Sequence, residues 1–232
     1  MTQLNFRRRV GLLGVGWLVL FLLGAAVLQG EPPPIDAPIS QVREYFQDGG
    51  RRYLIGDLLA GVAFVLLLLP FAVMLPRALG VADRLSPVWS HLTTSGAVAL
   101  VAVGGTATSF LDAVAMARGD SRLDDSTVTA LLYANSAGIA LIGLPAAVFA
   151  AAAATLIWNS SAPRAIAVLG WVAAGLLVVG AAFPIGTDPH GPLWTIRFVS
   201  FLSLAAFVAA TSVNLLTRAS RPTNSDHHAD RT

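Results

Sequence analysis

The run from Tyr53 to Arg77 constrains this chain more than any other stretch. Between Leu58 and Leu75 it contains no charged residue and no polar side chain. At a rise of about 1.5 Å per residue, a helix of that length covers most of the roughly 30 Å hydrocarbon core of a bilayer. A helix that is apolar on every side must be surrounded by lipid or by other helices, so the sequence predicts a transmembrane segment here.

Five further apolar runs repeat this design. They cover residues 10–28, 88–110, 127–158, 165–183 and 195–216. The chain is 55% hydrophobic and 12% charged, whereas soluble domains contain about 25% charged residues. The sequence therefore predicts an all-α, polytopic membrane helical bundle with six transmembrane helices. We expect the chain to consist of a basic lead at residues 1–9, a membrane domain at 10–217 and a disordered tail at 218–232.

The first run also has some features of a signal peptide, because small residues, Gly24 and Ala26, follow its apolar core. It is longer than a signal peptide needs and more spans follow it. We interpret it as a retained first helix. The fourth run exceeds what one perpendicular crossing needs, so we expect a tilt or a kink at Pro145, and a second kink at Pro70.

The first outer loop, residues 30–52, is the longest hydrophilic connection. Asp36 is placed to cap a short helix, and Gly49-Gly50 is placed to end it. The apolar residues of that helix fall on one face: Ile39, Val42 and Phe46. The sequence predicts a short interfacial helix that lies on the membrane or caps the bundle; a lid over an outward-facing cavity is the alternative.

Arginine alone supplies the positive charge, because the chain has no lysine. With the N-terminus in the cytoplasm, nine arginines fall in inside segments and five in outside segments, Arg197 being left out as intramembrane. Short cytoplasmic segments carry an excess of basic residues in membrane proteins. Both termini are therefore predicted to be cytoplasmic.

Four polar residues inside the predicted spans are the candidate site. In this orientation Asp57, Asp112 and Arg197 lie toward the outer leaflet, and Asn135 lies deeper in its helix. Intramembrane charges are costly and tend to face inward and pair, so we expect Arg197 to pair with Asp57 or Asp112. The cluster is interpreted as a packing knot, with a ligand or ion site and a catalytic site as alternatives. Gly105, Thr108, Ser109 and Asp112 share one face of the third span, where close helix approach is expected.

Several chemistries are excluded by what the sequence lacks. Without cysteine there is no disulfide, thiolate metal site or cysteine nucleophile, and without lysine there is no Schiff-base cofactor. The metalloprotease, Walker A and nucleophile-elbow motifs are absent. Ile55-Gly56-Asp57 lacks the second glycine of the GxGD pattern of intramembrane aspartyl proteases. No catalytic residue, metal site or cofactor is predicted, and no basic stripe suggests nucleic acid.

Short motifs add a resemblance to a known family. Tyr45, Phe46, Arg51 and Arg52 end the outer segment, and Gly56-Asp57 opens a long apolar helix. The stretch Ser160 to Gly170 resembles a Ser-x-x-Pro-Arg-x-x-x-x-Leu-Gly entry to a fifth helix. Together these features resemble a family of uncharacterised bacterial six-helix membrane proteins that carries a domain-of-unknown-function label, and the alanine-rich, lysine-free composition resembles actinobacterial proteins. The resemblance implies a fold and no activity.

The function expected from the sequence is that of an integral membrane protein of the bacterial cytoplasmic membrane. Its leading interpretation is a structural or interaction protein, with the lipid bilayer as its surroundings and a homo-oligomer or a membrane-protein partner left open. The alternative is a small-solute permease or ligand sensor that uses the outer polar cluster.

Overall fold

The computed structural model describes residues 3–30, 33–82, 85–118, 123–182 and 192–220. Within these ranges the chain forms six helical rods and no strand. The first rod is α1 (Gln3–Leu22), continued by the π-helix η1 (Leu23–Gln29). The others are α2 (Ile39–Val62) with η2 (Ala63–Leu68) and α3 (Leu69–Leu79), α4 (Pro87–Met116), α5 (Asp125–Leu141) with α6 (Gly143–Trp158), α7 (Arg164–Gly180) and α8 (Pro192–Ala219).

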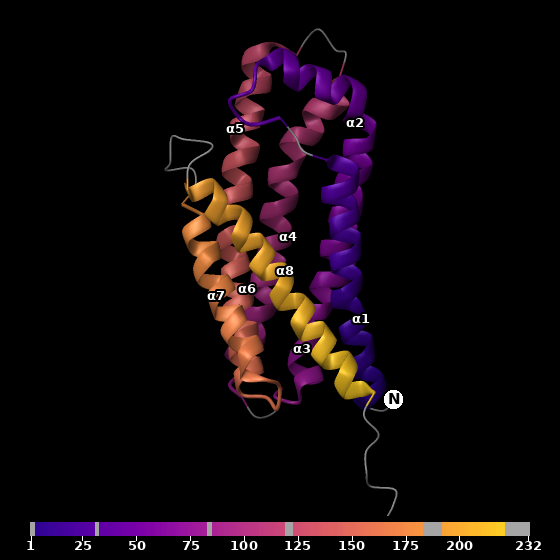
Figure 1. The fold of residues 1–232 in the computed structure, drawn as a ribbon, viewed down its shortest axis with the longest axis vertical. Coiled ribbons are helices and arrows are strands. Elements are labelled where there is room, and N and C mark those ends of the chain that lie inside the picture. Colours follow the sequence, from indigo (N-terminus) through magenta and orange to yellow (C-terminus); the bar gives the residue numbers. More distant parts are fainter. Residues whose placement is uncertain (1–2, 31–32, 83–84, 119–122, 183–191, 221–232) are drawn as a thin grey trace, which may run out of the picture.

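The rods run alternately up and down, so α1 begins at the end of the bundle where α8 finishes (Figure 1). We call this the lower end, and the end where α2 begins the upper end. Five rods in the described ranges are long and apolar enough to cross a membrane: 3–29, 39–79, 87–116, 125–158 and 195–219. The remaining rod, α7, is apolar but has 17 residues. The all-helical membrane class agrees with the sequence, and the sixth crossing stays a prediction.

The bundle is packed through small residues and has an apolar exterior. α6 is the most enclosed helix, and most of its buried residues are alanines, among them Ala146, Ala150 and Ala153. By contrast, Leu58 and Leu66 on the second rod are 66% and 60% exposed. Small residues inside and large apolar residues outside are the arrangement that lipid favours, because helix association there depends on close packing.

The two prolines act on their rods in different ways, and the kink predicted at Pro70 is not tested by the helix assignments. Pro145 lacks the N–H that would bond the carbonyl of Leu141, and α5 ends at Leu141, with α6 starting at Gly143. At Pro70 the rod does not break. The turn before it widens into η2, where the N–H of Leu69 bonds the carbonyl of Phe64, five residues back.

The first helix is part of the main core. Val10 and Trp17 are buried. At the lower end, Nε of Arg7 donates to the carbonyl of Ala78 at 3.0 Å, and the guanidinium of Arg77 lies 5.4 Å from the ring centroid of Phe6. α1 begins at Gln3, so most of the predicted lead is helical. α8 continues to Ala219, inside the predicted tail, and residues 221–232 lie outside the described ranges.

The predicted interfacial helix is the first part of α2. This part lies across the upper end of the bundle before the rod turns downward (Figure 1). Val42 and Phe46 are buried in a second, smaller core with Leu111 and Val128, so the segment caps the bundle. The prediction that Gly49-Gly50 ends a separate helix is wrong, because α2 continues through both glycines.

Tertiary packing explains why the helix continues there. A Cβ at Gly50 would lie 3.1 Å from Cδ of Arg118 and 3.4 Å from the carbonyl oxygen of Ala115. The backbone of α2 is therefore pressed against the end of α4, and this contact outweighs the low helix propensity of glycine. The predicted cap residue Asp36 is not the N-cap either, since α2 begins after Pro38.

Candidate functional site

The structure brings Asp57 of α2 and Asp112 of α4 together at the upper end. Their carboxyl groups lie close enough to interact with each other. The hydroxyl of Thr108, one turn before Asp112, donates to the carbonyl of Gly105 in its own helix. Carboxylates only accept hydrogen bonds, so a bond between two carboxyl groups requires a proton on one of them. We call the pair of Asp57 and Asp112 the acid dyad.

A third rod contributes Gln29, the last residue of η1. Its Nε2 donates to Oδ1 of Asp57 at 3.2 Å. Oδ1 of Asp112 is buried and accepts no hydrogen bond from a described amide, hydroxyl or guanidinium group. The dyad therefore has one neutral donor in Gln29 and retains an acceptor oxygen that protein donors do not satisfy.

Two glycines explain how Gln29 reaches the dyad. A Cβ at Gly24 would lie 2.5 Å from the carbonyl oxygen of Gly56, and a Cβ at Gly56 would lie 2.7 Å from that of Gly24. Only glycine permits so close a contact between backbones. Gly56 also touches Gln29, since its Cβ position is 2.9 Å from Cγ of Gln29. The crossing of η1 and α2 at these glycines sets the amide beside Asp57.

An aromatic cluster lies above the dyad. Tyr45, Phe46 and Tyr53 contact one another edge to face, with centroid distances of 4.9 Å for Tyr45–Phe46 and 5.3 Å for Phe46–Tyr53. The hydroxyl of Tyr45 donates to the carbonyl of Gln29 at 2.5 Å. Tyr53 is 4% exposed. These rings rigidify the upper end around Gln29.

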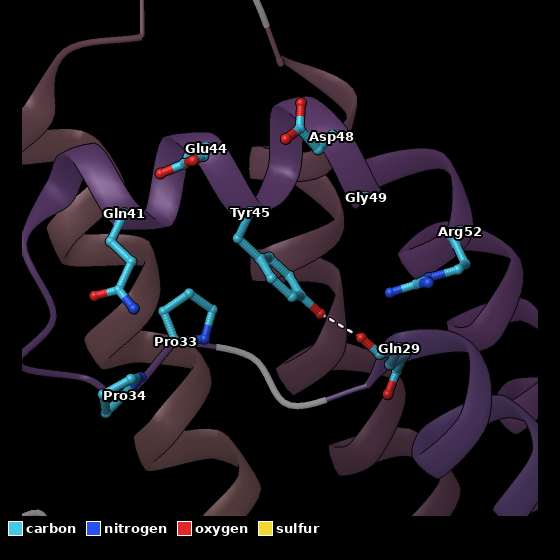
Figure 2. Close-up of a pocket in the computed structure, with 9 residues that line it drawn as sticks. All are labelled: Gln29, Pro33, Pro34, Gln41, Glu44, Tyr45, Asp48, Gly49 and Arg52. Atoms are coloured by element: carbon cyan, nitrogen blue, oxygen red, sulfur yellow. Dashed lines mark hydrogen bonds between the residues drawn. The ribbon is translucent and has the colours of Figure 1, made fainter.

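A cleft of about 710 Å³ opens between the start of α2, the segment before it and the end of η1. Figure 2 shows its lining: Gln29, Pro33, Pro34, Gln41, Glu44, Tyr45, Asp48, Gly49 and Arg52. The side chains of Tyr45 and Arg52 extend toward Gln29, whereas Glu44 and Asp48 point away from it (Figure 2). Because Gln29 lines the cleft and bonds Asp57, it connects the cleft to the dyad.

The other two predicted residues do not join the dyad. Asn135 of α5 donates Nδ2 to the carbonyl of Ala107 at 2.9 Å and so links α5 to α4. Beside it, a Cβ at Gly138 would lie 2.6 Å from Cβ of Ala107. The close approach on α4 therefore occurs at Ala107. The close helix approach predicted for the face of Gly105 is absent at that glycine, where an added Cβ meets nothing within 4 Å.

The predicted pairing of Arg197 with Asp57 or Asp112 is wrong. Among the residues that the structure describes, the ion pair within 4 Å is Arg43–Asp125. Arg197 is on α8, and its Cα is 3.1 Å from the Cβ position of Gly180 on α7. α8 packs on α1 and α7, and it begins beside α7, away from α2 (Figure 1). The order of the helices around the bundle separates the arginine from the acids.

Sequence reasoning missed Gln29, Tyr45 and Tyr53 as members of this site. Gln29 had a signal, since it is an amide directly after a long apolar run, as Asn159 also is. Comparison with known proteins adds no further constraint: no family model, no curated protein and no solved structure matches the chain. The resemblance to the uncharacterised bacterial family stays a prediction.

Proposed function

We propose that this chain is an integral membrane protein that binds a small solute at its upper end, as a permease or a ligand sensor. The observation that carries the proposal is the acid dyad of Asp57 and Asp112 under an open cleft. Gln29 lines the cleft and also donates a hydrogen bond to Asp57. Acid pairs that exchange a proton are common where membrane proteins couple binding to a conformational change. A solute in the cleft would act on the dyad through Gln29.

The absence of an arginine at the dyad favours binding over a purely structural knot. A packing knot is expected to pair opposite charges, since an uncompensated buried charge is strongly destabilising. Here two acids face each other without a described base within 4 Å. Such a pair costs stability, and a cost of this kind is typical of functional sites.

A structural or interaction protein is the second candidate. It is favoured by the hydrogen bonds that link neighbouring rods, Gln29 to Asp57 and Asn135 to Ala107. Side-chain bonds of this kind hold transmembrane helices together. If this candidate holds, the acids stabilise packing and no solute binds.

The two candidates are separated by the response of the protein to solutes and pH. Wild type, Asp57→Asn and Asp112→Asn are purified in nanodiscs, and melting is followed with and without amino acids, sugars and small organic cations. We expect a solute that raises the melting temperature of wild type by an amount that depends on pH, and the two variants to lose that dependence. Ser109→Ala, an exposed hydroxyl bonded within its own helix, is the control. If both acid variants respond as wild type does, the dyad has no part in binding.

The placement in a bacterial cytoplasmic membrane, with both termini inside, is part of the proposal. Two observations support it: the arginine excess in the predicted inside segments, and the common end shared by the start of α1 and the end of α8 (Figure 1). The upper end, with the dyad and the cleft, then faces outward.

A further inference from the structure

We infer that the upper cleft binds a small zwitterion of the α-amino-acid type, with its carboxylate on Arg52. This inference rests on the proposed function and names the chemical class of its solute. The cleft presents a charged group to its interior.

That group is the guanidinium of Arg52. It extends toward Gln29 and Tyr45, and Nη2 lies 3.8 Å from the Cβ position of Gly30 (Figure 2). In the described part of the chain no carboxylate lies within 4 Å of it. A guanidinium is charged at every physiological pH and offers a planar pair of donors that matches a carboxylate. Arg52 is thus a carboxylate-binding group without a carboxylate.

The charge of the surrounding acids disfavours a solute that is only anionic. Glu44 and Asp48 lie on the rim with their carboxylates turned away from the interior, and the acid dyad lies behind Gln29 (Figure 2). A phosphate or a dicarboxylate would meet one base and several acids. A solute with one carboxylate and one ammonium group carries no net charge for these acids to repel. The neutral acceptors for its ammonium group are the amide oxygen of Gln41 and the carbonyl of Gln29 in the lining.

The rest of the lining suits a small organic body. Tyr45 and the adjoining Pro33 and Pro34 offer apolar surface, and Gln41 offers an amide (Figure 2). Small-molecule sites occupy about 300–1,000 Å³, and the cleft holds about 710 Å³. Gln41, Tyr45 and Arg52 are spaced by four and seven residues, so one face of α2 presents all three.

The neighbouring arginine provides a matched control. Arg51 and Arg52 are both exposed, but only Arg52 lines the cleft. Binding is measured by calorimetry on the full chain in nanodiscs, with the common L-α-amino acids as probes and with acetate, ethylammonium and inorganic phosphate. We expect at least one amino acid to bind more tightly than acetate, ethylammonium and phosphate, each of which carries charge of one sign only. Arg52→Gln should weaken its binding about tenfold or more, and Arg51→Gln should change it less than about twofold.

Three results would overturn the inference: no amino acid binds, phosphate binds better than every amino acid, or Arg52→Gln binds as wild type does. These failures differ from a failure of the proposed function. A neutral or cationic solute whose binding depends on Asp57 and Asp112 but not on Arg52 would retain the function and reject the zwitterion. An amino acid held by Arg52 without any effect of the acid variants would retain the site and reject its coupling to the dyad.

Discussion

At the scale of single residues, the contact between Gly24 and Gly56 decides whether the dyad keeps its amide donor. In Gly56→Ala the new Cβ would lie 2.7 Å from the carbonyl oxygen of Gly24 and 3.0 Å from the backbone nitrogen of Gln29. Backbone atoms cannot rotate away, so η1 must move. We expect a loss of about 1–3 kcal/mol in the free energy of unfolding, measured by denaturant or thermal melting.

Gly61 on the same helix is the control for this substitution. A Cβ there meets nothing within 4 Å. Gly61→Ala removes backbone freedom from the unfolded chain without a clash and should stabilise α2 by about 0.5–1 kcal/mol. Equal melting temperatures for the two alanine variants would show that the glycine crossing does not position Gln29.

Asp124 gives a residue-scale prediction about pH, because it caps α5 from outside the membrane segment. The hydroxyl and the N–H of Thr127, the latter at 2.7 Å, and the hydroxyl of Ser126 lower the pKa of its carboxyl. An acid whose folded pKa is lowered stabilises the fold above its unfolded pKa and loses that contribution as pH falls through the folded pKa.

We therefore expect Asp124→Ala to melt below wild type at neutral pH, and the difference to shrink as the pH falls below about 4. Asp124→Asn, which retains a capping oxygen without a charge, should lie between the two at neutral pH. A difference between wild type and the alanine variant that grows in acid would contradict this account of the cap.

At the scale of elements, the start of α2 holds the cleft in place. Phe46 is 2% exposed and touches Tyr45 and Tyr53 in the smaller core. Phe46→Ala should cost about 3–5 kcal/mol and speed hydrogen exchange in residues 39–50 more than in α6. Leu58→Ala, which removes a side chain that is 66% exposed on the apolar exterior, should leave exchange in that segment unchanged. Uniform exchange changes in both variants would mean that the segment does not fold as a separate unit.

The elements also show what a sequence of this kind can predict. The apolar runs, the break near Pro145 and the buried face of Val42 and Phe46 follow from local rules, and the structure has them. The pairing of Arg197 depended on which rods are neighbours, and apolar runs of equal quality carry no information about their order. The end of the interfacial helix at Gly49-Gly50 failed for a related reason, since contact with α4 keeps that backbone helical.

At the scale of the whole molecule, the alternating direction of the rods determines which loops lie on the same side of the membrane. The start of α1 and the end of α8 share the lower end, and the start of α2 lies at the upper end (Figure 1). Asn159 and Ser161 follow α6 at the lower end, where Arg218 donates hydrogen bonds to Ser161. Asp48 is exposed at the upper end. A bundle in a membrane therefore presents Asp48 and Asn159 to opposite compartments.

The chain has no cysteine, so single-cysteine variants report on one position each. In intact bacterial cells we expect Asp48→Cys to react with a membrane-impermeant maleimide, and Asn159→Cys to react only after lysis, because the arginine excess predicts that the lower end faces the cytoplasm. Both side chains are exposed, so poor reactivity cannot come from burial. The reverse pattern would invert the protein and turn the cleft toward the cytoplasm. Labelling of both positions in intact cells would mean that the rods between them do not separate two compartments, and the acid dyad would then have no gradient across which to act.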